Sequence, residues 1–407
     1  MRLPSALTPL QHRPFLLLTS GSFLTFLGAQ IQIVGASWEM MSLTTSSTLV
    51  ALVQSASTLP ALLFALLGGA LADMFDRRRV LMTAQGIMLI AACLLLVAQQ
   101  TGAMTPWLLL GLTFLLNIGS TLRMPVQAAM TNELVGVSEI TRAVSITGIS
   151  FNLARSVGPG LAGIVIAPWG VMGAFVVNTI CICGAIGSSF SLSTTHSASG
   201  KQPSHIGRAI LEGLRYCAAE AVLRNMLVRT FCWVFFAISV WALLPLIAKQ
   251  NLGGGPLLLG ILFACQGIGA ITGATVTPSL LKHFGIKRLE KRLTLAFAPV
   301  LAISACADTL WWLVPALLIG GCVWLTFLNV PSTTMQLAAP PLVRGRVLSI
   351  NLMALYASMG LGAWFWGMVA DLAGLRVALL VAAAGLTANL LLHRWLPHEE
   401  STSQIQT

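Results

Sequence analysis

The sequence predicts an all-α membrane protein in which twelve transmembrane helices form two pseudo-symmetric six-helix bundles. Three observations support this fold: the composition, the recurrence of long apolar stretches, and an internal repeat. Of the 407 residues, 9% are charged and 56% are hydrophobic, and the mean hydropathy is +0.86. A soluble chain carries about 25% charged residues, so this chain cannot cover its own surface in water. The composition excludes a soluble enzyme, a disordered or collagenous chain and a small disulfide scaffold.

Apolar stretches long enough to cross a bilayer recur along the whole chain. About 20 helical residues span a hydrocarbon layer roughly 30 Å thick. We expect spans near residues 14–40, 47–72, 79–99, 105–129, 142–166, 168–190, 227–249, 256–280, 292–308, 310–336, 346–370 and 375–395. The first is predicted to be a span and not a cleavable signal peptide, because it is too long and lacks a small-residue cleavage site.

The basic residues indicate the orientation. A net charge of +11 alone would suggest a nucleic-acid or anionic-membrane partner. The bases lie in the short gaps between apolar stretches, and no segment interleaves them with aromatic residues, so we expect no nucleic-acid partner. If both termini are cytoplasmic, most of the 23 Lys and Arg lie on that side, and the opposite side keeps only Lys249 and Arg376. The positive-inside rule therefore predicts a multi-pass protein with both termini in the cytoplasm.

The two halves of the sequence repeat each other at an offset of a little over 200 residues. The segment 142–146 matches 346–350 in residue type. The same register pairs three glycines of each half: Gly158 with Gly362, Gly163 with Gly367, and Gly170 with Gly374. A parallel repeat in a membrane chain is typical of secondary transporters whose site lies between the halves.

A polar interval separates the halves and sets the predicted domains. We expect an N-terminal six-helix bundle over 1–190, a cytoplasmic linker over 191–225 and a C-terminal bundle with a short cytoplasmic tail over 226–407. The interval begins with the Ser/Thr-rich stretch 191–199, which favours a flexible linker. Apolar residues then recur at helical spacing and predict an amphipathic surface helix: Ile206, Ile210, Leu211, Leu214 and Ala218.

The most specific local motif lies between the second and third spans, at residues 68–79. Glycines at the end of a span permit close approach of a neighbouring helix, and Asp73 can accept hydrogen bonds from a helix N-terminus or from arginine. Contacts of this kind can form in one conformation and break in another. The alternative is that the three arginines Arg77, Arg78 and Arg79 serve only to fix the topology.

This motif resembles the one that joins the second and third helices in the major facilitator superfamily. The family pattern is matched by Gly69, Leu71, Ala72, Asp73, Arg77 and Arg78, with Asp76 in place of the usual glycine. Aspartate before the arginines is similar to the bacterial exporter branch that includes the enterobactin exporter and the macrolide efflux proteins. Segments 152–155, 212–216 and 344–346 support this branch.

The resemblance implies the major facilitator fold, the bacterial inner membrane, and export by alternating access. It also implies a cytoplasmic gate formed by Gly69, Asp73, Arg77 and Arg78 against the helix that starts near Arg346. The second-half copy of the motif has Lys282 where the first has Asp73, so the gate is not expected to be symmetrical.

Two arginines are predicted to lie inside the membrane. A central arginine costs about 2.5–3.5 kcal/mol on insertion scales, so Arg123 and Arg155 should face a wet cavity. Helical spacing places polar residues on the same faces, and the full set of cavity candidates is Gln32, Asn117, Arg123, Gln127, Asn152, Arg155 and Tyr356. Such a cavity favours an anionic or hydrogen-bond-accepting amphiphile. Alternatively, Arg123 snorkels to the interface, and the remaining groups join helices by hydrogen bonds.

Two further features bear on mechanism. Gly158, Pro159 and Gly163 resemble part of a fifth-helix motif that the superfamily associates with antiporters, and they predict a helix able to bend; ordinary helix packing is the alternative. Proton coupling needs an accessible carboxylate, and Glu39 is the candidate, unless it is a solvated interfacial residue. Proton antiport itself is implied by the resemblance and by the lack of an ATP-binding motif.

The expected function is export of a small amphiphilic molecule such as a siderophore, a metabolite or a drug. A broad multidrug exporter of neutral or cationic compounds is the main alternative. A membrane-embedded enzyme is less favoured, because no HExxH motif is present and no histidine lies in the middle of a span. An importer is less favoured because the resemblance is to exporters. The eight cysteines have neither zinc-site nor disulfide spacing. We expect a monomer in the lipid bilayer with no metal and no cofactor.

Overall fold

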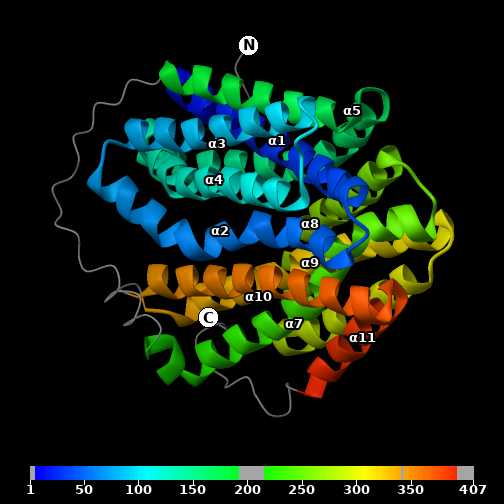
Figure 1. Ribbon diagram of the computed structural model, residues 1–407. Helices are drawn as coiled ribbons and strands as arrows, with labels where there is room; N and C mark the ends of the chain where they lie inside the picture. Colours follow the sequence, from blue (N-terminus) through cyan, green and yellow to red (C-terminus); the bar gives the residue numbers. More distant parts are fainter. Residues whose placement is uncertain (1–4, 192–214, 341–342, 392–407) are drawn as a thin grey trace. The chain divides into compact units, whose positions relative to one another are not determined.

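The computed structural model describes residues 5–191, 215–340 and 343–391, and within them the secondary structure is helical throughout, without strands (Figure 1). The predicted all-α fold is confirmed. The structure describes only residues 215–219 of the predicted linker helix, which are helical; the rest of that prediction, 192–214, lies outside the described residues.

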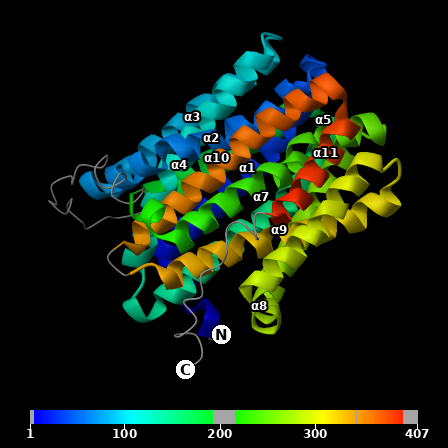
Figure 2. The same cartoon turned by 90° about the horizontal axis from the view of Figure 1, so that it is seen from below.

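The N-terminal part of the chain forms five labelled α-helices. They are α1 (Arg13–Leu43), α2 (Ser47–Met74), α3 (Arg77–Gln100), α4 (Pro106–Leu134) and α5 (Ile140–Phe190), with short 3-10 helices at Ser5–Gln11 and Val137–Glu139. Thr105 caps α4, because its hydroxyl accepts the backbone N–H of Leu108. Figures 1 and 2 both show α1 lying along α5, and these two helices are in extensive contact.

The C-terminal part repeats this pattern with five more labelled α-helices. They are α7 (Ala221–Leu246), α8 (Pro256–Cys306), α9 (Leu310–Ala338), α10 (Arg344–Ala373) and α11 (Leu375–Ala388), with a π-helical turn at Ile247–Asn251 and a 3-10 turn at Asn389–Leu391. Here α10 lies along α7 in both views, as α5 lies along α1 in the first half.

Two of these helices each contain two spans joined at a glycine. Gly170 in α5 and Gly285 in α8 have φ values of 64° and 66°, a left-handed conformation that breaks the helix and that glycine adopts without strain. The described chain has 9 helices long and apolar enough to cross a membrane. Counting α5 and α8 twice and adding the shorter apolar helix α11 gives twelve, in agreement with the predicted spans.

The described helices divide into two compact units. The first unit falls within Met1–Thr45, Ala56–Pro203 and Gly254–Ala264, and the second within Ser46–Ser55, Ser204–Gly253 and Cys265–Thr407. The first turns of α2 therefore belong with the second unit, and the first turns of α8 belong with the first unit.

Each unit has a dense interior and an apolar exterior. In the second unit, the rings of Trp233 and Phe327 stack with centroids 3.8 Å apart, and Trp324 packs beside them. Large apolar side chains such as Ile90 and Ile164 are exposed on the helix surfaces of the first unit. In a chain that spans a membrane, such surfaces face lipid, whose tails are as apolar as the side chains.

The glycines paired by the sequence repeat occupy equivalent positions. A Cβ on Gly158 would lie 2.6 Å from the Cβ of Gln30 in α1, and one on Gly362 would lie 2.8 Å from the Phe235 carbonyl oxygen in α7. At both places, a glycine therefore permits two helices to approach closely. The third pair also agrees, since Gly374 has a φ of 88° where Gly170 has 64°.

Candidate functional site

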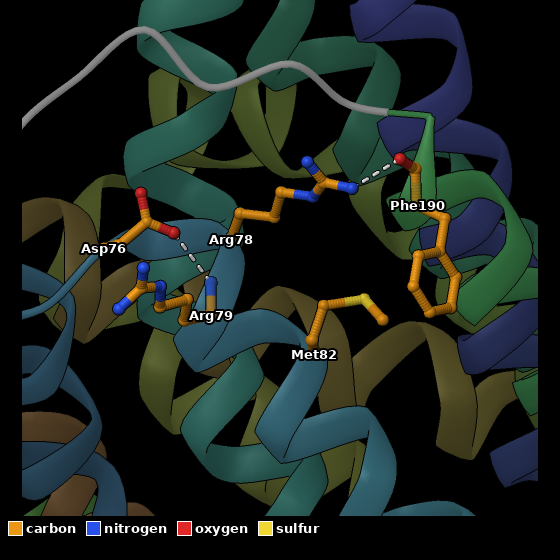
Figure 3. Close-up of a pocket in the computed structure, with 5 residues that line it drawn as sticks. All are labelled: Asp76, Arg78, Arg79, Met82 and Phe190. Carbon is orange, nitrogen blue, oxygen red and sulfur yellow. Dashed lines mark hydrogen bonds between the residues drawn. The ribbon is translucent and has the colours of Figure 1, made fainter.

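The turn between α2 and α3 holds the predicted gate motif. Asp76, which replaces the family's glycine, caps α3 because its carboxylate accepts the backbone N–H of Arg79 at 2.9 Å. Arg78 donates to the backbone carbonyl of Phe190 at 2.6 Å. Figure 3 shows these groups around a hollow of about 450 Å³, which Met82 also lines.

The structure adds a residue to this motif that the sequence did not suggest. Arg77 donates to the Ala72 carbonyl at 3.4 Å and forms an ion pair with Glu133 at the end of α4. Glu133 is more than fifty positions away in the sequence, so the pair depends on the packing of α4 beside the turn. Asp73 lies in the last turn of α2, and its side chain is outside the described part of the structure.

The two glycines of the motif differ in their surroundings. A Cβ on Gly68 would lie 3.1 Å from Pro125 and 3.2 Å from the Leu122 backbone, both in α4. A Cβ on Gly69 would meet no described atom within 4 Å. Close helix approach at this end of α2 therefore depends on Gly68, the neighbour of the predicted gate residue Gly69.

Arg123 is the centre of a buried polar cluster between α1 and α4. Its side chain is 1% exposed, and its Nη1 donates to Gln127 Oε1 at 2.6 Å and to Ser22 Oγ at 3.3 Å. The guanidinium carbon lies 4.9 Å from the centre of the Phe26 ring, within cation–π range. The predicted face of α4 is thus turned inward at Arg123 and Gln127, and the first of them does not snorkel to an exposed surface in this structure.

The other cavity candidates are distributed more widely. Gln32 donates to the Thr113 hydroxyl at 3.3 Å, and Asn117 donates to the Thr113 carbonyl, so these two meet at one point of α4. Asn152 donates to the carbonyl of Gly148 in its own helix and is half-buried, as is Arg155. Tyr356, which belongs to the second unit, is also half-buried.

The predicted proton and hinge residues lie on α1 and α5. Glu39 is 8% exposed, so in this structure it is buried within its unit. Pro159 is buried in α5 beside Gly158. A Cβ on Gly163 would lie 2.9 Å from the Cα of Leu257, at the start of α8. The glycines at both ends of this segment therefore permit close helix contacts.

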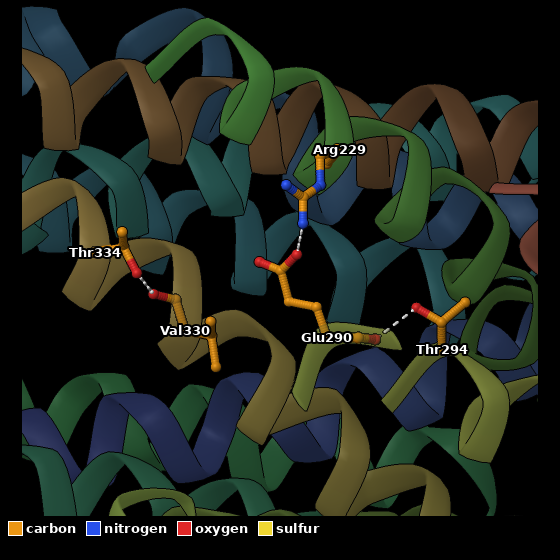
Figure 4. Close-up of polar contacts among 5 residues, drawn as sticks. All are labelled: Arg229, Glu290, Thr294, Val330 and Thr334. Carbon is orange, nitrogen blue, oxygen red and sulfur yellow. Dashed lines mark hydrogen bonds and ion pairs between the residues drawn. The ribbon is translucent and has the colours of Figure 1, made fainter. Parts of the chain in front are cut away.

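The second unit contains a buried ion pair that sequence reasoning missed. Arg229 in α7 and Glu290 in α8 are 4% and 3% exposed, and Figure 4 shows the two side chains pointing at each other. The backbone carbonyl of Glu290 also accepts the hydroxyl of Thr294 at 2.9 Å. From the sequence, the positive-inside rule alone explains Arg229. Glu290 is the single acidic residue in the basic segment 282–292, and this was the sequence signal that could have indicated an ion pair.

A second missed feature lies at the start of α2. The Asp371 carboxylate at the end of α10 accepts the backbone N–H groups of Ser47 and Thr48 and the hydroxyls of Ser46 and Thr48. It therefore caps the N-terminus of α2. A Cβ on Gly367, one turn earlier in α10, would lie 2.9 Å from the Thr48 Cα, so the two backbones touch.

The arrangement provides polar groups enclosed by helices and no metal-binding cluster within the described residues. The whole chain, residues 4–406, matches the family described as transmembrane secretion effector. The chain belongs to this family of major facilitator transporters. Its fold class and its membership of the exporter branch, predicted from the motif, are confirmed by this match and by the relatives.

Several transporters resemble this member of the superfamily. The staphyloferrin A transporter of Staphylococcus aureus is 26% identical over 66% of this chain and 67% of its own length. The multidrug efflux pump Tap of Mycolicibacterium fortuitum is 25% identical over 92% and 93%, respectively. The enterobactin exporter EntS of Shigella flexneri is 26% identical over 69% and 67%.

Solved structures agree on the fold. The nucleoside transporter NupG superposes with a TM-score of 0.79 at 15% identity, covering 94% of this chain and 99% of NupG. A bacterial homologue of the lysosomal transporter Spinster gives a TM-score of 0.71 at 14% identity and covers 95% of each chain. At this identity, the likeness concerns the fold alone.

Proposed function

We propose that this transporter exports a small amphiphilic molecule, such as a siderophore, a metabolite or a drug, across the bacterial inner membrane. The observation that carries the proposal is the full-length family match, joined to relatives named for the export of enterobactin and macrolides and for multidrug efflux. Transport proceeds by alternating access of the two bundles, 1–190 and 226–407, which the linker 191–225 connects. The protein works as a monomer in the lipid bilayer, with both termini in the cytoplasm.

Proton antiport is the proposed energy source. The chain carries no ATP-binding motif, so the gradient of an ion has to drive uphill export. Glu39 is the proposed proton site, because it is a carboxylate enclosed in α1 at 8% exposure. A buried carboxylate whose exposure changes between two conformations can exchange a proton with each side in turn.

The α2–α3 turn is the proposed cytoplasmic gate, formed by Gly69, Asp73, Arg77 and Arg78. Its support is the family motif, together with the ion pair of Arg77 and the short hydrogen bond of Arg78 to the end of α5. In this proposal Asp73→Asn lowers the turnover rate more than it lowers substrate affinity, because a gate acts on the conformational step. Equal turnover of wild type and Asp73→Asn would reject the gate.

The cavity candidates Gln32, Asn117, Arg123, Gln127, Asn152, Arg155 and Tyr356 supply polar groups for the substrate, and Gly158, Pro159 and Gly163 supply a bendable α5. A second candidate function is broad multidrug export of neutral or cationic compounds. The observation in its favour is the likeness to the pump Tap, which covers nearly the whole of both chains.

Accumulation in cells tests the proposed function. Cells with and without the protein are loaded with a panel of siderophores and of cationic, neutral and anionic drugs, with the proton gradient intact or collapsed. Lower accumulation of at least one compound, reversed by collapsing the gradient, is expected. An unchanged panel would contradict export, and export that survives collapse would contradict proton coupling.

A further inference from the structure

The guanidinium of Arg123 is enclosed but only partly bonded. An arginine carries five N–H donors in a rigid planar fork. Only Nη1 has partners, Gln127 and Ser22, whereas Nε and Nη2 are inaccessible to solvent and have no hydrogen-bond partner. In the described part of the chain, no carboxylate forms an ion pair with this side chain. Arg123 is thus a buried positive charge without a negative partner.

Physical chemistry makes such a state costly. Transfer of an isolated charge from water into a protein interior is strongly unfavourable unless an opposite charge and hydrogen bonds compensate it. The second unit follows that rule, because its buried Arg229 faces Glu290. In the first unit Gln127, Ser22 and the Phe26 ring supply only neutral partners. The missing negative charge at Arg123 therefore points to a ligand.

The unused nitrogens define the geometry of that ligand. Nε–H and one N–H of Nη2 lie in the guanidinium plane along the same edge and point in parallel, so they form the side-on fork that donates to two oxygens of one oxyanion. A carboxylate fits this fork with two parallel hydrogen bonds. A single-atom acceptor would satisfy only one of the two donors.

The surroundings indicate what is attached to the oxyanion. The half-buried Phe26 ring lies over the guanidinium, and its other neighbour is the exposed Phe151 of α5, whose ring centre is 5.0 Å away in an edge-to-face arrangement. Phe26 thus stands between the buried charge and a more exposed aromatic side chain. The two rings, one over the guanidinium and one more exposed, offer an aromatic surface for a flat apolar group.

We propose that Arg123 is the anion-recognition residue of the transporter and that its substrates are organic carboxylates with an aromatic or other flat apolar part. This inference rests on the proposed function and adds the substrate class. The carboxylate binds side-on to Nε and Nη2, and Gln127 and Ser22 hold Nη1 in place.

Binding to the purified protein tests the proposal without relying on transport. The probes are 2-naphthoate and 2-naphthamide, which have the same shape and differ in charge. Their affinities are measured by the rise in melting temperature and by isothermal titration for wild type, Arg123→Gln, Arg123→Lys and the control Arg142→Gln, which removes an exposed arginine of α5. We expect wild type to prefer naphthoate by roughly tenfold or more, the size typical of charge-assisted hydrogen bonds.

The variants separate recognition from a structural role. Arg123→Gln should lose the preference for naphthoate but keep naphthamide affinity within about twofold; Arg123→Lys should keep part of the preference because it keeps the charge without the fork. Arg142→Gln should bind like wild type, because it removes an equal charge from an exposed position. Failure of wild type to bind naphthoate, equal affinity for both probes, or a preference that persists in folded Arg123→Gln would overturn the inference.

The accumulation experiment distinguishes a failure of the proposed export function from a failure of the proposed anion site. Selective naphthoate binding without export of any compound would contradict the proposed function and leave Arg123 as an anion site. Export of cationic and neutral compounds at the same rate by wild type and Arg123→Gln, with no selectivity for carboxylates, would contradict the anion site and leave export intact.

Discussion

Arg123 in the first unit and Arg229 in the second are both enclosed by helices, at 1% and 4% exposure. Arg229 faces the carboxylate of Glu290, whereas Arg123 has only neutral partners. One charge is therefore compensated within the protein and the other is not. The difference shows that two equally buried arginines need not have the same role. The ion pair of Arg229 and Glu290 connects two helices, whereas the unpaired donors of Arg123 are available to bind a ligand.

Removing one member of the Arg229–Glu290 ion pair is expected to have the largest effect on stability. Arg229→Gln leaves the Glu290 carboxylate buried without its cation, and such changes cost about 3–5 kcal/mol. The double variant Arg229→Gln with Glu290→Gln should regain much of the loss, because no charge stays buried. Melting temperatures of the purified variants measure this.

The matched substitution in the first unit sharpens the comparison. Arg123→Gln removes a charge that has no partner in the protein, so we expect it to leave the stability unchanged or raise it slightly. If Arg123→Gln proved as damaging as Arg229→Gln, Arg123 would be a structural link between α1 and α4, and the contrast between the two units would disappear.

The equivalent glycines offer a comparison of close helix contacts. In Gly163→Ala and Gly367→Ala, the new Cβ would lie 2.9 Å from a backbone Cα, of Leu257 and Thr48 respectively, so a helix has to shift. Overpacking of this kind costs about 1–3 kcal/mol. The control is Gly69→Ala, where no described atom lies within 4 Å and the better helix propensity of alanine should stabilise slightly.

Transport and melting assays on these variants check the symmetry of the repeat. Gly163→Ala and Gly367→Ala should lower the melting temperature alike, whereas Gly69→Ala should leave it unchanged or raise it slightly. A loss at only one of the two positions would mean that the two helix starts, of α2 and α8, are held by different contacts.

How far the sequence predicts the structure follows from the range of each interaction. The sequence is sufficient to predict the spans, because apolar length is a local property of the chain. It also pairs the glycines through the repeat register and contains the glycines Gly170 and Gly285 at which helices break. The inward face of Arg123 was accessible through helical spacing. Asp76 could also have been recognised, as an N-cap residue directly before a helix.

Contacts between distant helices were not accessible. The pairs Arg229–Glu290 and Arg77–Glu133 depend on which helices become neighbours, and a single sequence does not determine that. Bases near the ends of spans already had a sufficient explanation in membrane topology. Their ion-pair partners lie on other helices, so the local sequence does not identify them.

Asp371 provides the next prediction, because it distinguishes the two helix starts. It caps α2, whereas the residue at its repeat-equivalent position in the first half is Ala167, which has no carboxylate. Asp371→Asn removes the charge that favours a helix N-terminus and one acceptor oxygen, so we expect a loss of about 1 kcal/mol. We expect Asp371→Asn to lower the melting temperature, and to lower it more at low ionic strength. The difference from wild type should vanish at pH values that protonate Asp371 in the wild type. No difference at neutral pH would show that Ser46, Ser47 and Thr48 start the helix without it.

Among the substitutions expected to destabilise the protein, breaking the ion pair of Arg77 and Glu133 should have the smallest effect. Its side chains are 26% and 32% exposed, against 5% and 4% for Arg229 and Glu290, so water and salt screen the attraction. Glu133→Gln is therefore expected to cost between about 0 and 1 kcal/mol and to lose its effect in high salt. The same substitution at Glu290 should remain destabilising in high salt, since solvent does not reach that pair. If Glu133→Gln instead slowed transport while the melting temperature stayed constant, Glu133 would belong to the gate motif as a moving contact of Arg77, because a static surface ion pair has no means of changing a conformational rate.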